Sequence, residues 1–384
     1  MRHLPLVWAA IVRKPMRAVL TLLSVTVAFT LFGLMIGLNA AFDTIAERAR
    51  ADRVYTWPRY GGSAPITVAH QIEAMPGIKA ATGLNFLPGY VQDPKNQAFV
   101  LMVDQNAAKV FGDWVPPDQW NVVWRERTGI VMSRMQAQRW HKKVGDTFTI
   151  ICKTIKRADG GTTWTFRVVT IVDDIPQIFN GFIFGNFDYI DKAKPLADQG
   201  KISEVDFLAD DPANSTALAA QIDHTFANSA TPMQTITEKL ARSGNDFGGL
   251  DVKKITFGIA LAGMFMVLFL TGNGIAESVR ERFAEFATLK TIGFSDRAVT
   301  AIVVLESALP CVIGAVLGVG LAAVLARQIP KLMPPTFSMP MPTMSPAVML
   351  WAAAAALAVA ALSAALPVLR LRQMDIASAL SGRA

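Results

Sequence analysis

Charged residues are scarce in this sequence. They make up 17% of its 384 residues, whereas 52% of the residues are hydrophobic, and the mean hydropathy is positive (+0.34). An ordinary soluble domain carries about 25% charged residues, because its surface must face water. The scarcity of charge therefore excludes a simple soluble protein and predicts a membrane protein that also has a water-soluble part.

Cysteine and histidine are also rare, with two and four residues respectively. Cys152 lies in a segment that we expect in water and Cys311 in one that we expect in lipid, so we predict no disulfide between them. The histidines are scattered, and no spacing of Cys or His matches a metal-binding pattern. We therefore predict no metal site.

The motifs of common enzymes are missing as well. The sequence has no G-x-x-x-x-G-K-[ST], no H-E-x-x-H and no G-x-S-x-G, so it has no P-loop with which to bind ATP. A catalytic triad drawn from distant residues would leave no such motif and is the alternative. We predict a non-catalytic chain without a cofactor of its own.

The net charge of +7 is concentrated next to apolar runs. Basic and acidic residues are equal in number between residues 41 and 255. The basic excess lies before the first apolar run and after the last one, at Arg2, Arg13, Lys14, Arg17, Arg370, Arg372 and Arg383. Basic residues that flank membrane spans mark the cytoplasmic side. This distribution predicts cytoplasmic N- and C-termini and argues against nucleic acid as a partner.

Four apolar runs are long enough to cross a bilayer. The first, residues 18–42, contains no charge and exceeds the ~20 residues that a crossing requires. A cleaved signal peptide is the alternative, but its apolar region would be only ~7–15 residues long. The predicted segments are, in chain order, an amphipathic cytoplasmic N-terminus (1–17), the first span (18–42), a periplasmic domain (43–254), the second span (255–276), a cytoplasmic coupling helix (277–297), the third span (298–326), a periplasmic loop (327–345), the fourth span (346–369) and a cytoplasmic tail (370–384).

Residues 43–254 have the character of a soluble α+β region with its own core, large enough for two subdomains. Runs of β-branched and aromatic residues bounded by turn residues predict its strands. The expected strands are 97–103, 129–133, 147–152, 163–172 and 204–208, and the expected helices are 134–141 and 215–226. The predicted fold class is an α-helical membrane protein with four transmembrane helices (one plus three) and a large α+β periplasmic domain between the first and the second.

A charged, amphipathic segment, residues 274–295, connects the second and third spans. Apolar side chains recur every three or four residues along it, which predicts one stripe on an α-helix. The stripe consists of Ile275, Val279, Phe283, Phe286, Leu289 and Ile292. Glu277, Glu281 and Glu285 follow another face, where nearby arginines offset their mutual repulsion. Gly293 is suited to end this helix and Ser295 to begin the next. A solvated connecting helix is the alternative interpretation.

Glu306 is the one acidic residue within a predicted span. An acid at membrane depth is a candidate functional residue by default. At ~1.5 Å per residue it lies about 12 Å beyond Ala298, within reach of the membrane interface. A proton relay would need further acids in other spans, and the sequence has none there. We therefore predict a structural role for Glu306, bonded to a neighbouring helix or to the cytoplasmic helix.

Small residues are frequent in the third and fourth spans. Gly314, Gly318 and Gly320 lie in the third span, and a run of alanines occupies the fourth. Small side chains let helix backbones approach closely, which predicts tight helix packing or dimerisation.

Several stretches of the sequence match one family of membrane permeases. They are residues 8–21 (WAAIVRKPMRAVLT), 129–133 (GIVMS), 143–148 (KVGDTF), 166–171 (FRVVTI) and 279–295 (VRERFAEFATLKTIGFS) with 305–307 (LES). On these stretches, and in its span layout, essentially the whole chain resembles the ABC transporter permeases that include the macrolide exporter MacB, the lipoprotein-release (LolC/LolE-like) permeases and the division protein FtsX. The sequence departs from the family at 285–287 (EFA), where Glu-Ile-Gly is usual, and at Phe294, where Ala is usual.

The resemblance implies a permease subunit that dimerises with a second copy or a paralogue. Since 17 residues precede the first span, we expect the ATPase, with its bound ATP and Mg, on a separate chain. The implied mechanism is mechanotransmission, in which the ATPase shifts the coupling helix and the first two spans move the periplasmic domain. The implied location is the bacterial inner membrane, and further implied partners are a periplasmic adaptor and membrane lipid.

The cargo implied by the resemblance is apolar, lipid-like or peptidic, and it is exported or extracted. The alternative is an FtsX-like, non-transporting transducer that regulates a periplasmic hydrolase. A membrane-tethered sensor is a third possibility, but the sequence has no cytoplasmic signalling domain. We assign ATPase coupling to Glu281, Phe283, Glu285, Phe286, Leu289, Lys290, Ile292 and Gly293. The apolar members are expected to pack into the membrane bundle or the ATPase, and the charged members to set partner choice.

Overall fold

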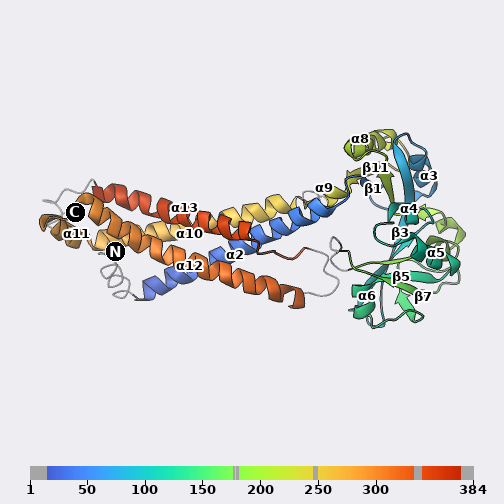
Figure 1. The fold of residues 1–384 in the computed structure, drawn as a ribbon, viewed down its shortest axis with the longest axis horizontal. Coiled ribbons are helices and arrows are strands. Elements are labelled where there is room, and N and C mark those ends of the chain that lie inside the picture. Colours follow the sequence, from blue (N-terminus) through green and yellow to red (C-terminus); the bar gives the residue numbers. More distant parts are fainter. Residues whose placement is uncertain (1–14, 176–177, 179–180, 245–249, 333–339, 373–384) are drawn as a thin grey trace. The chain divides into compact units, whose positions relative to one another are not determined.

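The computed structural model describes residues 15–175, 178, 181–244, 250–332 and 340–372 (Figure 1). These residues form two units. One is an α+β unit that comprises Asp43–Leu250, and the other is a helical unit made of the segments that precede and follow it in the sequence. Parts of four predicted segments lie outside the described residues: 1–14 of the N-terminus, 176–177, 179–180 and 245–249 of the periplasmic domain, 333–339 of the periplasmic loop and 373–384 of the tail.

Four long helices and one short helix make up the described part of the helical unit. The long helices are α2 (Pro15–Arg48), α10 (Val252–Glu281), α12 (Asp296–Leu332) and α13 (Pro346–Arg372), and the short one is α11 (Phe283–Thr291). Each long helix has the length and the apolar composition needed to cross a membrane. Helices satisfy their own backbone hydrogen bonds, as a lipid environment demands. The predicted layout of one helix before the α+β region and three after it is confirmed.

Glycines let α2 and α12 pack closely. A Cβ atom placed on Gly318 would lie 2.6 Å from the Thr26 carbonyl oxygen and 2.7 Å from the Phe29 Cβ, and one on Gly314 would lie 2.6 Å from a Val25 methyl group. The hydroxyl of Thr30 donates a hydrogen bond to the Gly318 carbonyl oxygen at 3.1 Å. Two of the three glycines noted in the sequence therefore serve helix contact, as predicted.

Hydroxyl and amide side chains also join the long helices. The hydroxyls of Thr271 on α10 and Ser363 on α13 are both buried and lie 2.6 Å apart. The hydroxyl of Thr256 on α10 donates to the Asn39 side-chain oxygen on α2 at 2.5 Å. Packing and such polar contacts hold helices together in lipid, where apolar burial gives no net drive.

The α+β unit contains eleven strands among its described residues. They are β1 (Arg53–Pro58), β2 (Ala64–Pro65), β3 (Ile78–Tyr90), β4 (Gln97–Val103), β5 (Gly129–Ser133), β6 (Thr147–Ile151), β7 (Thr163–Val172), β8 (Ile183–Asn186), β9 (Lys201–Ile202), β10 (Glu204–Ala209) and β11 (Met233–Thr237). Its helices are α3 (Thr67–Glu73), α4 (Ala107–Val110), α5 (Pro117–Arg125), α6 (Arg134–Arg139), α7 (Phe187–Asp191), α8 (Ser215–Phe226) and α9 (Glu238–Arg242). The predicted strands and helices are confirmed, with α6 ending before residue 141 and β6 before residue 152.

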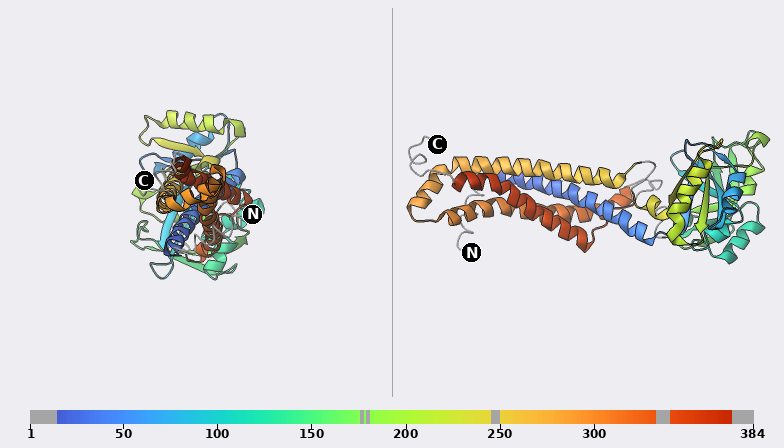
Figure 2. Two further views of the ribbon diagram at one scale, coloured as in Figure 1. Left: turned by 90° about the vertical axis from the view of Figure 1, so that its left-hand side faces the viewer. Right: turned by 90° about the horizontal axis from the view of Figure 1, so that it is seen from above.

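The long strand β3 unites the two halves of the α+β unit. Nine strands pair in the order β11-β1-β10-β3-β4-β8-β5-β7-β6, and β6 also pairs with β3 through Tyr90 and Ile151. The strands from β3 to β6 therefore close into a ring, whereas β10, β1 and β11 extend β3 as an open sheet. Helix α3 packs against β3 and β10, and α8 packs against β1 and β11, in the open sheet (Figure 2). The two subdomains that the length suggests thus share one sheet.

Substituting Gly318 tests the α2–α12 contact. We expect Gly318→Val to lower the free energy of unfolding by about 1–3 kcal/mol, because the added side chain must displace backbone atoms of α2. Gly320→Val on the same helix is the matched control, since no atom lies within 4 Å of a Cβ placed there. Thermal unfolding of the detergent-solubilised chain measures both. Equal effects of the two substitutions would contradict the close contact.

Candidate functional site

The connector between the second and third spans is a helix of its own. Helix α10 continues without interruption through residue 276, where we expected the span to end, and stops at Glu281. Arg282 leaves the helical conformation, with φ −108° and ψ 17°, and α11 begins at Phe283. The apolar stripe predicted for one helix is therefore divided between α10 and α11, which changes which residues can face the same side.

An apolar cluster attaches α11 to both neighbouring helices. Val279 of α10, Phe286 of α11 and Val299 of α12 are buried together, and Phe286 is only 1% exposed. Ile275, Leu289 and Phe294 pack around these three residues. Phe286 and Leu289 thus lie in the membrane-side bundle, which is one of the two environments that we expected for them.

The outer face of this connector is polar, with one apolar exception. Glu281, Glu285 and Thr288 are exposed. Ile292 is 71% exposed and is not part of the apolar cluster. The predicted stripe therefore does not extend to Ile292, because the chain turns before this residue can reach α12. The side chains of Phe283 and Lys290 lie outside the described part of the structure.

Arg282 stabilises the start of α11. Its Nε donates to the Glu285 carboxylate at 2.8 Å, and its guanidinium lies 5.1 Å from the centre of the Phe286 ring. A cation over an aromatic face and an ion pair three residues along a helix are both weakly stabilising at exposed positions. The predicted compensation of glutamate repulsion by arginine is confirmed for this pair.

The end of α11 is defined by Gly293. Its φ of +103° is a conformation that side chains other than glycine rarely adopt. The N–H of Phe294 donates to the Leu289 carbonyl at 3.0 Å, and both side chains pack on the apolar cluster. These are the features of a Schellman C-cap. The Ser295 hydroxyl then accepts a hydrogen bond from the N–H of Ala298, at 3.3 Å, at the start of α12. Both predicted capping roles are confirmed.

Glu306 lies on α12, and its side chain is outside the described part of the structure. Its backbone position is ten residues after Asp296, where α12 begins.

A buried arginine that our sequence reasoning missed lies at the start of β1. Arg53 is completely buried. It forms ion pairs with Asp113 and, at 3.3 Å, with Glu238 at the start of α9, and it donates to the Val110 carbonyl at 3.0 Å. Its guanidinium lies 4.9 Å from the centre of the Trp114 ring. Because β1 follows α2 and α9 is the last described helix before α10, this ionic cluster joins the two ends of the α+β unit.

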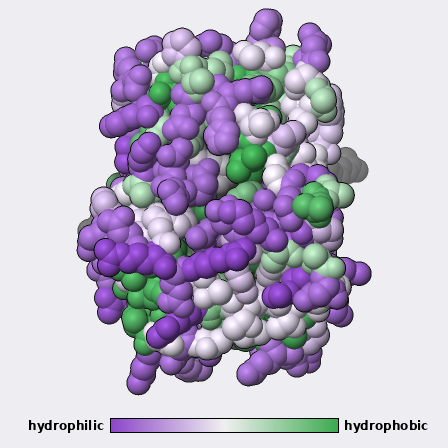
Figure 3. All heavy atoms as spheres, turned by 90° about the vertical axis from the view of Figure 1, so that its right-hand side faces the viewer, coloured by the Kyte–Doolittle hydropathy of each residue, from purple (hydrophilic) through white to green (hydrophobic). Residues whose placement is uncertain are grey.

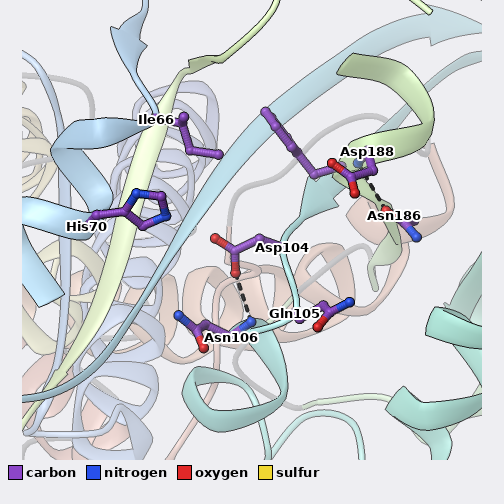
Figure 4. Close-up of a pocket in the computed structure, with 8 residues that line it drawn as sticks. Ile66, His70, Asp104, Gln105, Asn106, Asn186 and Asp188 are labelled. Atoms are coloured by element: carbon purple, nitrogen blue, oxygen red, sulfur yellow. Dashed lines mark hydrogen bonds between the residues drawn. The ribbon is translucent and has the colours of Figure 1, made fainter. Parts of the chain in front are cut away.

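The α+β unit also contains a polar recess of about 270 Å³. The residues that line it are Ile66, His70, Asp104, Gln105, Asn106, Asn186, Phe187 and Asp188 (Figure 4). Asp104 accepts hydrogen bonds from the Thr82 hydroxyl at 2.7 Å and from the N–H groups of Gly83 and Asn106 at 3.0 and 2.9 Å. Burial raises the pKa of Asp104 above its ordinary value despite these donors. These hydrogen bonds fix the position of the Asp104 carboxyl group, so we assign it a structural role.

Catalytic and metal-binding arrangements are not evident in the described residues. None of their groups of His, Cys, Asp and Glu could hold a metal ion. Cys152 and Cys311 are both buried and not joined in a disulfide. One face of the α+β unit, shown in Figure 3, is hydrophilic over most of its area, with small separate apolar areas. The connector around α11 is therefore the strongest candidate site in the helical unit.

Comparisons with known proteins support this reading of the architecture. The chain matches the model of the MacB-like periplasmic core domain over residues 18–225 and that of the FtsX-like permease C-terminal region over residues 255–376. No curated protein sequence matches significantly.

The chain is also similar to several solved structures. They include the periplasmic region of MacB from Actinobacillus actinomycetemcomitans (11% identity, covering 52% of this chain and 94% of that one, TM-score 0.35). They also include the extracellular domain of the ABC-type transporter YknZ from Gram-positive bacteria (7% identity, 48% and 100% covered, TM-score 0.34) and a domain of a putative permease from Porphyromonas gingivalis (12% identity, 48% and 85% covered, TM-score 0.28).

The fold and the connector define a multi-pass membrane protein with a large α+β domain inserted between its first and second membrane helices. The chain belongs to the MacB/FtsX family of permeases, whose members are membrane components of ABC-type transport systems. Membership of this family implies, in general, an ABC ATPase as the partner.

Replacing Arg53 tests the ionic cluster. We expect Arg53→Met to lower the free energy of unfolding by about 3–5 kcal/mol, because buried Glu238 would keep only Arg242, at 3.7 Å, as a basic partner. Arg59→Met is the control, since Arg59 is partly exposed and its ion pair with Asp223, at 3.5 Å, contributes about 0–1 kcal/mol at most. Denaturant unfolding of the full chain measures both free energies. A loss under 1 kcal/mol for Arg53→Met would show that the cluster is not stabilising.

Proposed function

We propose that this chain is the membrane subunit of an ABC transporter in which a separate ATPase subunit displaces α11 and the α+β unit moves in response. The transported or extracted cargo is apolar, lipid-like or peptidic. ATP and Mg are bound by the partner, and this chain is not catalytic. The observation that carries the proposal is the burial of Phe286 between Val279 and Val299, because a helix attached on both sides passes on a force applied to it.

The contact surface for the ATPase is the exposed side of the connector. Glu281 and Glu285 supply negative charge there, and Ile292 supplies an exposed apolar side chain next to Gly293. Exposed apolar residues rimmed by charge are typical of protein interfaces. Lys290, on the same helix, is a further candidate for setting partner choice, and Phe283 is a candidate for packing into the bundle or the ATPase. Leu289 and Phe286 serve the attachment to the bundle.

A displacement of α11 reaches α10 and α12 first, because the apolar cluster joins these three helices. From α10 it passes to α2 through the Asn39–Thr256 hydrogen bond and to α13 through the Thr271–Ser363 contact. The chain then runs from α2 into β1. A mechanism of this kind requires two positions of the connector that the nucleotide states favour differently. Glu306 of α12 has a structural role near this junction.

The topology follows from the basic residues that flank the spans. We place both termini and α11 in the cytoplasm, and the α+β unit in the periplasm, with the helices in the bacterial inner membrane. Further proposed partners are a second permease copy or paralogue, membrane lipid and a periplasmic adaptor. The second candidate function is an FtsX-like transducer that regulates a periplasmic hydrolase. Co-purification of a hydrolase with the α+β unit, instead of an adaptor and lipid-like cargo, would favour that function.

Charge reversal on the connector tests the docking surface. We expect Glu281→Lys combined with Glu285→Lys to reduce both ATPase co-purification and coupled ATP turnover at least tenfold, since like charges would then oppose a basic partner surface. Asp118→Lys combined with Asp210→Lys, at two exposed positions of the α+β unit, introduces the same charge elsewhere and is the control. If turnover and co-purification are unchanged in the first variant, α11 does not receive the ATPase in this way.

Two apolar substitutions separate docking from attachment. Ile292→Asp should weaken ATPase binding with less than about 0.5 kcal/mol change in stability, because this side chain is exposed. Phe286→Ala should instead lower the stability of the chain by about 3–5 kcal/mol, as expected for removing a buried aromatic ring.

Labelling of introduced cysteines tests the topology. We expect a cysteine at Thr288 to be protected from a membrane-impermeant maleimide in intact cells, and one at Asp118 to react. Both positions are exposed, and the natural Cys152 and Cys311 are buried, so their background labelling should be low. Permeabilised cells supply the control, in which both introduced cysteines should react. The reverse pattern in intact cells would invert the proposed topology.

A further inference from the structure

Two acidic side chains are neighbours on β10 of the α+β unit, one of them buried and the other half-buried. Glu204 and Asp206 are two residues apart on β10, so their side chains leave the same face of the sheet. Asp206 is only 4% exposed and lies opposite Tyr55 of β1 and Thr82 of β3. The two carboxyl groups are neighbours, and each shifts the pKa of the other. Two ionised carboxylates are acceptors only, so a hydrogen bond between them would require a proton.

One buried oxygen of this pair has no hydrogen-bond donor among the described residues. Oδ1 of Asp206 is buried and accepts no hydrogen bond from the N–H and O–H groups of the described residues. The Thr82 hydroxyl donates to Asp104 instead. Tyr55 is buried, which raises the pKa of its hydroxyl and keeps it neutral.

The nearby basic groups are engaged by other acids. Arg53 pairs with Asp113 and Glu238, and Arg242 of α9 lies 3.7 Å from the other carboxylate oxygen of Glu238. On α4, which also packs against β10, Lys109 is exposed. On α3, at the opposite face of the sheet, His70 is exposed and Glu73 accepts a hydrogen bond from Asn106. Arg53 lowers the pKa of Asp206 and Arg242 lowers that of Glu204, but burial has the larger, opposite effect on both. A second negative charge on the pair is therefore costly.

We propose that Glu204 and Asp206 bind one proton between them and form a pH-dependent latch that holds β10 against β1. With the proton in place, the two carboxyl groups bond to each other and the sheet is closed. When the proton leaves, two like charges face each other beside buried Tyr55, and the contact between β10 and β1 weakens.

The direction of the pH effect follows from burial. Burial raises the pKa of Glu204 to about 7 and raises that of Asp206 well above its ordinary value. The folded chain therefore retains a proton that the unfolded chain releases above about pH 4. Stability contributed by the pair is present at low pH and is lost as the pH rises toward and through 7. The two groups titrate as a unit.

The position of the latch links it to the ends of the α+β unit. β1 begins with Arg53 soon after α2, and α9 supplies Glu238 and Arg242 to the same cluster. In the proposed topology this unit faces a compartment whose pH follows the surroundings, so the latch would report external pH. That last step rests on the proposed function, whereas the latch itself does not.

Hydrogen exchange of the full chain in detergent micelles tests the latch. Exchange of amides in β1 and β10 is followed by mass spectrometry at pH 5.5, 6.5, 7.5 and 8.5, with correction for the intrinsic pH dependence of exchange. For the natural chain we expect the opening equilibrium of these strands to rise at least tenfold from pH 5.5 to pH 8.5. A flat profile in the natural chain would overturn the proposal.

Amide substitutions assign the effect to the pair. We expect the double variant Glu204→Gln with Asp206→Asn to give a flat profile, because an amide cannot ionise, and each single variant to reduce the slope. Asp210→Asn, at an exposed position just after β10, is the control and should retain the natural slope. Should Asp206→Asn fail to fold, Glu204→Gln at the less buried member of the pair decides the question. Variants that open more at every pH but keep the natural slope would show a merely structural role.

Infrared spectroscopy supplies an independent readout. A protonated, buried carboxylic acid has a carbonyl stretching band distinct from that of a carboxylate. This band should be present at pH 6.5 in the natural chain, should fade by pH 8.5, and should be reduced in Asp206→Asn. Its absence at pH 6.5 would also overturn the proposal, whatever the state of any partner ATPase.

Discussion

The contact of Phe286 with Val279 and Val299 determines what the connector between the second and third spans can do. Without it, α11 would be a short, charged helix held only by its two ends, and such a helix has little stability of its own. With it, the connector is fixed to the ends of α10 and α12. Gly293 and Ser295 support the same arrangement, because they end α11 and begin α12 within a few residues.

The helices that receive this contact are held together by close approach and by a small number of polar contacts. Gly314 and Gly318 bring α12 against α2, and hydroxyl groups join α10 to α13 and α2. Such an assembly is adapted to lipid. Lipid tails are as apolar as the side chains, so the helices gain no hydrophobic free energy by associating. Any movement of the connector must act on these same contacts.

The α+β unit is stabilised differently, because it is built around a sheet and has its own buried core. β3 belongs both to the closed ring of strands and to the open sheet, so the two halves cannot be separated without breaking it. At the ends of the unit the interior is unusually ionic, with Arg53, Glu238 and the carboxyl pair of Glu204 and Asp206 close together. Buried charges are costly unless paired, so their presence here makes the junction sensitive to the loss of any one partner.

Much of this architecture is determined by sequence alone. The four long apolar runs, the strands of the α+β unit and the caps at Gly293 and Ser295 all depend on local composition and periodicity, and the structure contains each of them. Membership of the MacB/FtsX family was likewise visible in short stretches such as residues 279–295.

Other features were decided by tertiary contacts. The break at Arg282 divides a stripe that is continuous in sequence, and it leaves Ile292 exposed while Phe286 is buried. The closure of β6 onto β3 and the burial of Arg53 join residues that are far apart along the chain. A local sequence pattern indicates which side of one helix or strand is buried. Pairing between distant elements depends instead on the tertiary structure of the whole chain.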